Sequence, residues 1–562
     1  MDNQRLLIWS FFGLLCWLTY QTWLQDYAPQ PKNNEMLSNQ PEETFSKNNS
    51  AAFDGSEDIL SDTPEYPTES ISTTATTKAV QESAPIIRVV TDVLDIEIST
   101  QGGTIQSATM LNYPIAKDKP DTVVELLSTN SNNFGVIQTG LRAIDSDDEA
   151  NHKAIFSSSK NTYTLDQKDS LVVPLLWKNN DGVVVEKRFR FVRGGYAIDV
   201  EQEVINNSLT EWRGTNYSQI QRVSKEQERS MFDVDSYSFV GPISYDGEKS
   251  KKYDRNDLMD DGPVTFKTKK GWLGSIQHHF LSAVIPNSDT EQSYRLIVKN
   301  DRSIASTIGQ AQSVSPGTRK VFFTTLFIGP KLQSQLEAID ENLKLTVDYG
   351  WLTILSQPLF WLLSTAYNFI GNWGLAIIFV TFLIKLVFYK LTESSGRSMA
   401  KLRNLQPRMK SLQDRYKDDK QALSSAMMEL YKREKVNPAA GCLPILIQMP
   451  FFLAFYWVLL ESVEMRQAPF VFWLTDLSTK DPYFILPLIM GAAMFFQQKL
   501  NPAPADPIQA KVMQIMPIMF TAFFAFFPSG LVLYWVTNTL LSIAQQWKIN
   551  KVVERESKES KR

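Results

Sequence analysis

The sequence predicts a multi-span α-helical membrane protein, with six transmembrane helices of which five form one core, joined to a large β-sandwich domain outside the membrane. Long apolar runs occur near the N-terminus and again after Tyr349, where Phe, Trp and Met are concentrated. Between residues 86 and 340, apolar and polar side chains instead alternate with a period of two, which is typical of half-buried strands. A polar, acidic stretch separates the first apolar run from these strands.

The composition excludes several classes of protein. The chain has 562 residues with 57 basic and 61 acidic side chains, and a net charge of −4 argues against a protein that coats nucleic acid along its length. Cys16 and Cys442 are too few for a disulfide framework or a cysteine-built metal site, and the three histidines are badly spaced for a metal centre. The sequence has no phosphate-binding G-x-x-x-x-G-K-[ST] motif and no G-x-S-x-G nucleophile motif. We therefore expect no metal, no cofactor and no catalytic residue.

Residues 1–25 are predicted to be an N-terminal transmembrane anchor. The run 6–24 is mostly apolar and would span about 28 Å as a helix, close to the hydrocarbon thickness of about 30 Å. A cleaved signal peptide is the alternative, but no small-x-small cleavage site follows the run, and its aromatic residues suit an interfacial belt. A basic residue precedes the run and an acidic residue follows it, which places the amino end in the cytoplasm.

Residues 26–85 are predicted to be a disordered acidic linker. They contain eleven acidic residues against three lysines and have few aromatic side chains. Such a segment cannot bury enough apolar surface to offset the entropy lost on ordering. Reach toward a partner is one interpretation of the linker, and a plain spacer is the other, which the composition favours.

Residues 86–340 are predicted to form a β-sandwich domain. Alternation is clearest in IIRVVTDVLDIEIST and VVVEKRFRFVRGGYAIDVEQEVINN, with shorter strands in RLIVKN and KVFFTTLFIG, and glycine pairs mark turns at 102–103 and 194–195. Because the domain follows an anchor whose amino end is cytoplasmic, it lies outside the inner membrane. Its acidic residues Asp233, Asp235 and Asp254 are interpreted as solvated loop charges rather than as catalytic carboxylates, and His152, His278 and His279 as packing or surface residues.

Six apolar runs lie after the β-sandwich domain, at 351–370, 373–391, 442–460, 483–498, 512–527 and 530–547. The loop 392–440 carries eleven basic residues against six acidic ones, which places it in the cytoplasm by the positive-inside rule. Only one span can therefore precede this loop. We assign TM2 to 373–391 and interpret 341–372, with its Ser356-Gln357-Pro358, as an interfacial amphipathic helix. TM3–TM6 lie within 441–548, and 549–562 is a basic cytoplasmic tail.

Two features of these spans are unusual. Runs 483–498 and 512–527 have about 16 residues, or about 24 Å, and short spans thin the bilayer locally. Lys385 lies inside TM2, where a lysine costs about 2.5–3.5 kcal/mol on insertion scales and usually faces a wet interior, although it could snorkel toward the cytoplasmic headgroups. Other polar residues on the spans could line a hydrated cavity or form helix–helix hydrogen bonds: Thr381, Gln448, Thr537, Asn538 and Gln545.

Residues 392–440 are predicted to be a cytoplasmic helical hairpin. Apolar side chains recur at three- and four-residue steps on both sides of Asp418-Asp419. The basic faces could bind RNA or anionic lipid, or could be solvated faces that obey the positive-inside rule.

Several long strings in the last 220 or so residues are similar to those of one known family. They are VDYGWLTILSQPLF, GNWGLAIIFVTFLIK, MAKLRNLQP, KVNPAAGCLPILIQMPFFLAFYWVL, EMRQAPFVFWLTDLSTKDPYFILPLIMG and FPSGLVLYWVTNTLLSIAQQW. The chain resembles the YidC/Oxa/Albino family of membrane protein insertases. The anchor and the β-sandwich domain resemble the Gram-negative form, so the resemblance covers nearly the whole chain.

The resemblance implies a hydrophilic groove that five spans enclose and that opens to the cytoplasm and to lipid. In the family a basic residue of the second span attracts acidic residues of short substrate tails, and Lys385 stands at that position. Lysine keeps the charge of the arginine that is common there but lacks the guanidinium fork, and Trp535 stands where a second tyrosine is expected. The expected groove residues are Lys385, Thr381, Gln448, Met449, Pro450, Tyr534, Trp535, Thr537 and Asn538.

The resemblance also implies partners. The hairpin and the basic tail are expected to contact the ribosome and the nascent chain through Lys401, Arg403, Arg408, Arg415, Lys417, Lys548 and Lys551. The β-sandwich domain resembles a sugar-epimerase-type supersandwich, from which we carry over no catalysis, and in the family it contacts the Sec machinery.

We therefore predict a non-enzymatic insertase and chaperone that inserts and helps fold inner-membrane proteins, alone or with the Sec translocon. Its partners would be nascent membrane proteins, Sec translocon components, the ribosome and the bilayer. It would lie in the bacterial inner membrane, with both termini cytoplasmic and the β-sandwich domain periplasmic. The alternatives are a Sec-associated assembly chaperone without independent insertion, an enzyme seated in the β-sandwich domain, a passive scaffold, and a small-solute transporter, which the lack of an internal repeat disfavours.

Overall fold

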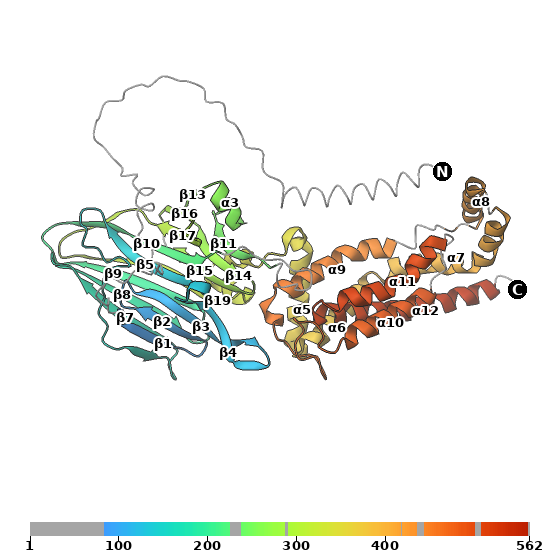
Figure 1. Ribbon diagram of the computed structural model, residues 1–562, viewed down its shortest axis with the longest axis horizontal. Helices are drawn as coiled ribbons and strands as arrows, with labels where there is room; N and C mark the ends of the chain where they lie inside the picture. The colour runs from blue at the N-terminus through green and yellow to red at the C-terminus, as the bar shows by residue number, and fades with distance from the viewer. Residues whose placement is uncertain are drawn as a thin grey trace, which may run out of the picture.

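The computed structural model describes residues 84–224, 238–286, 290–416, 419–434, 436, 443–500 and 507–559. The predicted anchor 1–25 and nearly all of the predicted linker 26–85 lie outside the described residues, as do Cys16, Cys442, Asp233, Asp235 and Lys417. The described chain has two parts, with strands at one end and helices at the other (Figure 1).

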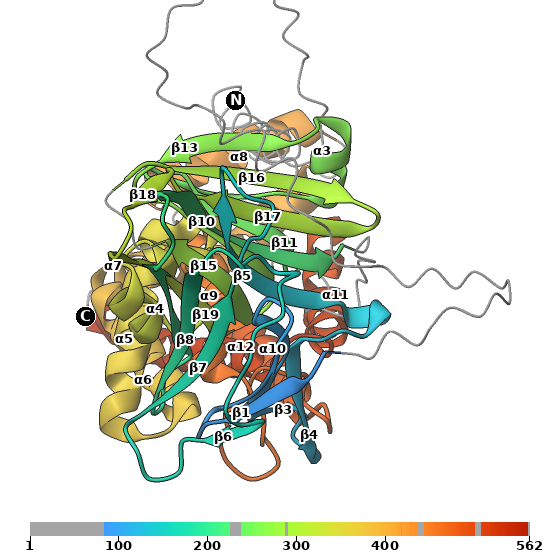
Figure 2. The same ribbon diagram turned by 90° about the vertical axis from the view of Figure 1, so that its left-hand side faces the viewer.

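The β part consists of two sheets packed face to face, which confirms the predicted β-sandwich. An 11-stranded sheet has the order β13-β16-β17-β10-β5-β3-β2-β1-β6, with β18 beside β10 and β4 beside β3. An 8-stranded sheet has the order β12-β11-β14-β15-β19-β9-β8-β7. Figure 2 views the molecule from this end, with the strands in front of the helices. Pairing is antiparallel except between β1 and β6.

The strand bounds follow the alternating pattern of the sequence. In β8, for example, Val183, Val185, Phe189 and Phe191 are buried and alternate with less buried residues. The strands are β1 Ile86–Val90, β2 Leu94–Ser99, β3 Thr104–Ala116, β4 Lys119–Leu127, β5 Gly135–Ala143, β6 Thr162–Thr164, β7 Ser170–Lys178, β8 Val183–Val192, β9 Ala197–Asn206, β10 Trp212–Val223, β11 Val240–Tyr245, β12 Ser250–Lys252, β13 Val264–Thr268, β14 Trp272–Gln277, β15 Phe280–Pro286, β16 Gln292–Lys299, β17 Arg302–Ile308, β18 Gln312–Val314 and β19 Arg319–Pro330.

The helical part begins after β19. Its helices are α4 Gln333–Ile339, α5 Thr353–Ile370, α6 Trp373–Val387, α7 Tyr389–Arg415, α8 Lys420–Arg433, α9 Leu443–Glu461, α10 Ile485–Leu500, α11 Pro507–Phe524 and α12 Ser529–Glu559, while α3 (Arg255–Asp260) belongs to the β part. Helix α5 is amphipathic because Ser356, Leu359 and Leu363 are buried three or four residues apart, whereas Ile354 and Phe369 are almost fully exposed.

The predicted span 373–391 is not one straight helix. Helix α6 ends at Val387, and α7 starts at Tyr389 at an angle of 69°. Among the described residues, no helix taken singly is long and apolar enough to cross a bilayer, whereas α6 and α7 pass that test together as a bent pair. The count of six spans therefore stays a prediction.

The β part and the helical part meet at an interface, here called the seam, that has both apolar and polar contacts. One continuous core cluster includes residues of both sheets and of α5, α6, α9 and α12. The loop between β3 and β4 contacts the segment after α9, because Lys117 donates to the carbonyl oxygens of Gln467 and Thr475. Arg466 donates in turn to the carbonyl oxygen of Pro114 at 2.8 Å. Contacts of this kind fix the β part against the loop that follows α9.

Helices α7 and α8 form a separate antiparallel pair at the far end (Figure 1). Their shared face has its own small core of Leu402, Leu405, Met409, Met427, Leu430 and Val436. The first half of α7 packs on the end of α12, where Ala400 meets Ile549 and Val553, and Arg397 pairs with Glu556.

Candidate functional site

Lys385 lies in the last turn of α6 and points toward α12. Its Nζ donates a hydrogen bond to Ser542 Oγ at 2.8 Å. The Ser542 hydroxyl donates its own hydrogen to the Asn538 carbonyl oxygen at 2.7 Å, one turn back along α12. Its lone pairs are therefore directed to the ammonium group, so the cation is held by a neutral acceptor.

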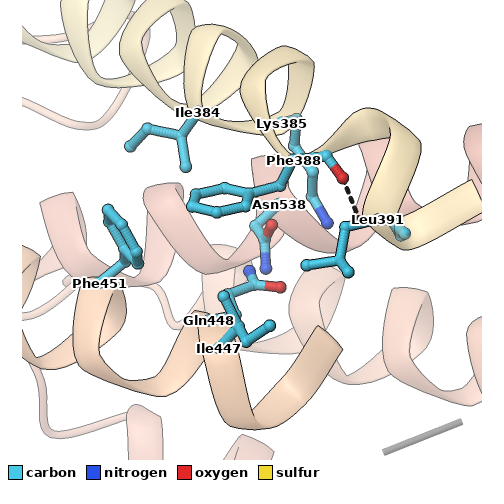
Figure 3. A pocket seen from close by; sticks show the side chains of 9 residues that line it. Ile384, Lys385, Phe388, Leu391, Ile447, Gln448, Phe451 and Asn538 are labelled. Atoms are coloured by element: carbon cyan, nitrogen blue, oxygen red, sulfur yellow. Dashed lines mark hydrogen bonds between the residues drawn. The ribbon is translucent and has the colours of Figure 1, made fainter. Parts of the chain in front are cut away.

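A small pocket surrounds this cation. It has a volume of about 30 Å³, which is room for one or two water molecules. Lys385 of α6, Gln448 of α9 and Asn538 of α12 point toward one another in it, as Figure 3 shows. The remaining wall is mostly apolar, with Phe388 and Phe451 facing each other edge to face at 5.1 Å. None of the described residues that line this pocket is acidic.

A larger cavity adjoins the small pocket, because Gln448 and Asn538 line both. Its volume is about 340 Å³, and α9, α10, α11 and α12 enclose it. Its wall includes four methionines, three glutamines and two aromatic residues of α12: Met449, Met494, Met513, Met516, Gln448, Gln497, Gln498, Tyr534 and Trp535. A flexible thioether wall of this kind adapts to apolar side chains of many shapes.

Aromatic packing holds the α12 side of this cavity in place. Tyr534 stacks on Phe455 at 4.5 Å and is almost fully buried. Trp535 meets Phe452 edge to face at 4.7 Å. Trp535 is therefore held by ring packing and, unlike a tyrosine at this position, has no phenolic hydroxyl.

The structure brings together six of the nine predicted groove residues. Lys385, Gln448 and Asn538 meet at the small pocket, and Met449, Tyr534 and Trp535 line the larger cavity. The other three, Thr381, Thr537 and Pro450, line neither of these two cavities. The two threonine hydroxyls bond to carbonyl oxygens of their own helices, Thr381 to Ile377 and Thr537 to Leu533. Pro450 lies in the interior of α9.

Four residues of these two cavities are not among the predicted groove residues: Ser542, Met494, Met513 and Met516. Ser542 lies one turn after Asn538 on α12, so the i, i+4 spacing was a signal that could have placed it on the same face. The three methionines gave no comparable signal, because apolar residues fill these helices and only the fold shows which ones meet.

The predicted ribosome and nascent-chain residues lie on α7 and on the end of α12. Lys401 and Arg403 are exposed on α7, and Arg408 pairs with Glu434 of the α8 end at 2.7 Å. Arg415 lies over the Tyr416 ring. In α12, Lys548 lies 5.9 Å from the centre of the Tyr389 ring, and Lys551 lies 5.0 Å from the centre of the Trp547 ring.

The β part contains buried polar groups but no metal-ligand cluster within the described residues. Lys187 is fully buried between the sheets, where its Nζ donates to the carbonyl oxygens of Gly102 and Thr139, each at 2.7 Å. Burial lowers the pKa of Lys187 to about 7. The His278 and His279 rings stack at 3.7 Å, and burial lowers the pKa of His279 well below its usual value.

The chain matches two family models that together cover most of its length. The model of the 60Kd inner membrane protein matches residues 365–557, and that of the YidC periplasmic domain matches residues 86–362. The membrane protein insertase YidC of Nitrosococcus oceani is 44% identical over 566 residues, with 99% of this chain and 100% of the relative covered. That of Methylococcus capsulatus is 44% identical over 561 residues, with 99% of each covered.

A solved structure of an active YidC insertase, with its first transmembrane domain resolved, is 18% identical. It covers 82% of this chain and 94% of its own, with a TM-score of 0.38.

The two family models show the class of protein to which the chain belongs. It is an inner-membrane protein with a periplasmic β-sandwich domain and a helical C-terminal region. Within that class, the chain belongs to the YidC family of membrane protein insertases. The predicted family and the predicted function as an insertase are thereby confirmed, and its substrates are membrane proteins.

Proposed function

We propose that Lys385 is the point at which this insertase receives the acidic tail of a substrate. The single observation that carries the proposal is the Lys385–Ser542 hydrogen bond of 2.8 Å, in a pocket whose described lining has no carboxylate. A cation bound to a neutral hydroxyl gains more from an incoming carboxylate than a cation already paired with one. The tail would displace Ser542, and Gln448 and Asn538 would supply further hydrogen bonds.

The adjoining methionine-lined cavity would receive the apolar part of the substrate. Each CH₂ group that leaves water gains about 0.8 kcal/mol, so an apolar segment needs no nucleotide to drive its transfer. Gln448 and Asn538 line both cavities, so the polar and apolar receiving sites would lie next to each other. A short polar tail and the apolar segment beside it would then be bound together.

The bilayer would lie across α6 and α9–α12, with the predicted anchor as the sixth span. Large apolar side chains are exposed on these helices, among them Phe379, Leu386, Leu488, Ile518 and Leu540. Helix α10 has 16 residues, or about 24 Å, so a locally thinned bilayer would shorten the path of the polar tail. The membrane potential would favour outward movement of a negative tail by about 2.3 kcal/mol per charge per 100 mV.

The cytoplasmic partners would bind at the α7–α8 pair. Exposed Lys401 and Arg403 support a contact with ribosomal RNA or a nascent chain. The β part would remain periplasmic, with both chain ends cytoplasmic, and would face the Sec translocon. We expect no enzymatic activity of the chain.

The proposal is tested by inserting a short, acidic-tailed single-span protein into liposomes that contain only the purified chain. We expect wild type and Lys385→Arg to insert it and Lys385→Ala to lose most of the activity. Lys390→Ala is the matched control, because Lys390 is exposed in the first turn of α7, beyond the bend. Equal insertion by Lys385→Ala and wild type would contradict the role of the charge. Failure of wild type to insert would favour an assembly chaperone that needs the Sec translocon.

A further inference from the structure

A second groove, between α10 and α12, faces away from the substrate pockets. Its volume is about 480 Å³, within the range of ligand-binding pockets. Phe496 of α10 and Leu540, Ile543 and Ala544 of α12 form apolar walls, and Lys499 and Trp547 stand at one end. Leu540 and Trp547 are seven residues apart on one helix, so the walls extend for about 10 Å. The groove thus has an apolar length and a cationic end.

Two lysines lie on aromatic rings at the cationic end: Lys499, which lines the groove, and Lys551, which lies on the ring of the groove residue Trp547. Lys499 Nζ lies 4.6 Å from the centre of the Phe495 ring, and Lys551 Nζ lies 5.0 Å from the centre of the Trp547 ring. Within the described parts of the chain, neither ammonium group forms a hydrogen bond or an ion pair to a side chain or carbonyl. Ring contacts hold an ammonium group in place but leave its N–H donors for another acceptor.

Trp547 also marks a boundary along α12. The residues before it are mostly apolar, whereas Lys548, Lys551 and Arg555 follow it. Tryptophan with adjacent basic residues is typical of the level at which hydrocarbon meets headgroups. In the proposed orientation, the apolar walls would lie at acyl-chain depth and the two ammonium groups at phosphate depth.

We propose that this groove binds an anionic phospholipid of the inner leaflet, with one acyl chain along Phe496, Leu540 and Ala544 and the phosphate at Lys499 and Lys551. Basic sites between helices at the cytoplasmic side select anionic headgroups, and each lysine contributes to that selection. The exposed fractions of Phe496 and Trp547, 61% and 60%, match a surface that a bound chain would cover. The assignment to the inner leaflet rests on the orientation given under the proposed function. The groove itself is independent of that orientation.

Lipid retention by the purified full chain, measured by native mass spectrometry, tests this inference. We expect wild type to bind one phosphatidylglycerol more tightly than phosphatidylcholine. Lys499→Gln should weaken phosphatidylglycerol binding about fivefold, the effect of one lysine at an anionic headgroup. Ala544→Trp should block the groove without changing the charge, because Ala544 is exposed and the fold does not need its small size.

Lys511→Gln is the matched control, since Lys511 is an exposed lysine of α11 outside the groove. An equal loss of phosphatidylglycerol binding in Lys511→Gln and Lys499→Gln would show that diffuse surface charge causes the effect, and would overturn the proposed site. Equal retention of the two lipids by wild type, or unchanged binding in Ala544→Trp, would overturn it as well. The assay contains no substrate, so its result is independent of the outcome for Lys385 in the insertion assay.

Discussion

Lys331 Nζ lies 2.9 Å from Glu461 Oε2, and both side chains are almost fully buried, with exposed fractions of 1% and 6%. Lys331 directly follows β19 and Glu461 ends α9, so this ion pair joins the β part to a helix that lines both candidate pockets. Taking two charges out of water is costly, so the pair specifies one arrangement of the two parts more than it adds net stability.

Removal of one partner of this pair should be strongly destabilising. Lys331→Met leaves the Glu461 carboxylate buried without its cation, which costs about 3–5 kcal/mol in comparable pairs. Thermal unfolding of the full chain in detergent measures the loss. The double variant Lys331→Met/Glu461→Met should recover most of it, because it removes both charges. If the stability loss of the double variant equals the sum of the losses in Lys331→Met and Glu461→Met, the two charges do not act as a pair.

Glu464 should make the seam sensitive to pH. Glu464 Oε1 accepts a hydrogen bond from the backbone N–H of Gln333 at 3.4 Å. Burial raises the pKa of the Glu464 carboxyl group to about 7. Because the pKa is raised on folding, its contribution to stability is full below about pH 4.5 and is lost as the pH rises to 7. The loss amounts to about 3 kcal/mol at about 1.4 kcal/mol per unit.

Hydrogen exchange of the segment after α9, measured between pH 5 and 8 and corrected for intrinsic exchange, reports this change. Glu464→Gln keeps the acceptor and removes this titration, so the fall in opening free energy with rising pH that is due to Glu464 should be lost in the variant. The same pH dependence in wild type and in Glu464→Gln would contradict the raised pKa.

Lys187 should act in the opposite direction within the β-sandwich. Its pKa falls to about 7 on folding, so the penalty for burying the charge is full below pH 7 and decreases as the pH rises toward 10. Between pH 7 and 9 we expect the free energy of unfolding of the β part to rise by about 1 kcal/mol per pH unit. The Lys187→Met variant should lack this slope, although it leaves the Gly102 and Thr139 carbonyl oxygens without their donor. The same slope in both proteins would assign it to other groups.

A side chain at Gly374 should destabilise the fold through a clash. A Cβ atom there would overlap the Phe470 ring of the loop between α9 and α10, whereas a Cβ at Gly371 would meet no atom within 4 Å. Gly371 has φ of +72° at the end of α5, so alanine there costs backbone strain of about 1–2 kcal/mol and nothing else. Gly374→Ala should cost about 1–3 kcal/mol through overpacking.

The two glycine variants are separated by a second change at Phe470. Phe470→Leu should relieve part of the cost of Gly374→Ala and none of the cost of Gly371→Ala, as measured by thermal unfolding of the double variants. Equal coupling of both glycines to Phe470 would contradict the contact.

The β-sandwich was predictable because its strands are half-buried, so that period-two alternation appears directly in the sequence, as in β8. The position of Lys385 was predictable for a related reason, since a charge inside an apolar run is conspicuous. The bend after Val387 was not, because the apolar run continues through it to Leu391 without a proline or glycine.

Long-range partners were also beyond the sequence. Ser542 is 157 residues from Lys385, and Glu461 is 130 residues from Lys331. Periodicity determines which face of a helix is polar, but the fold alone decides which two faces meet. Thr381 illustrates this, because it shares a face with Lys385 by spacing, yet its hydroxyl bonds to the carbonyl of Ile377.

Helix α12 is continuous over 31 residues and carries Ser542 near its middle and Glu556 near its end. Each inserted or deleted residue between these two positions would rotate them by about 100° relative to each other. Glu556 would then face away from Arg397 while Ser542 stayed against Lys385. Each residue would also move Glu556 by about 1.5 Å along the axis, so even a seven-residue insertion that restores the rotational phase would carry it about 10 Å away from Arg397. Homologues and engineered fusions that retain both contacts should therefore keep the number of residues between Ser542 and Glu556 unchanged.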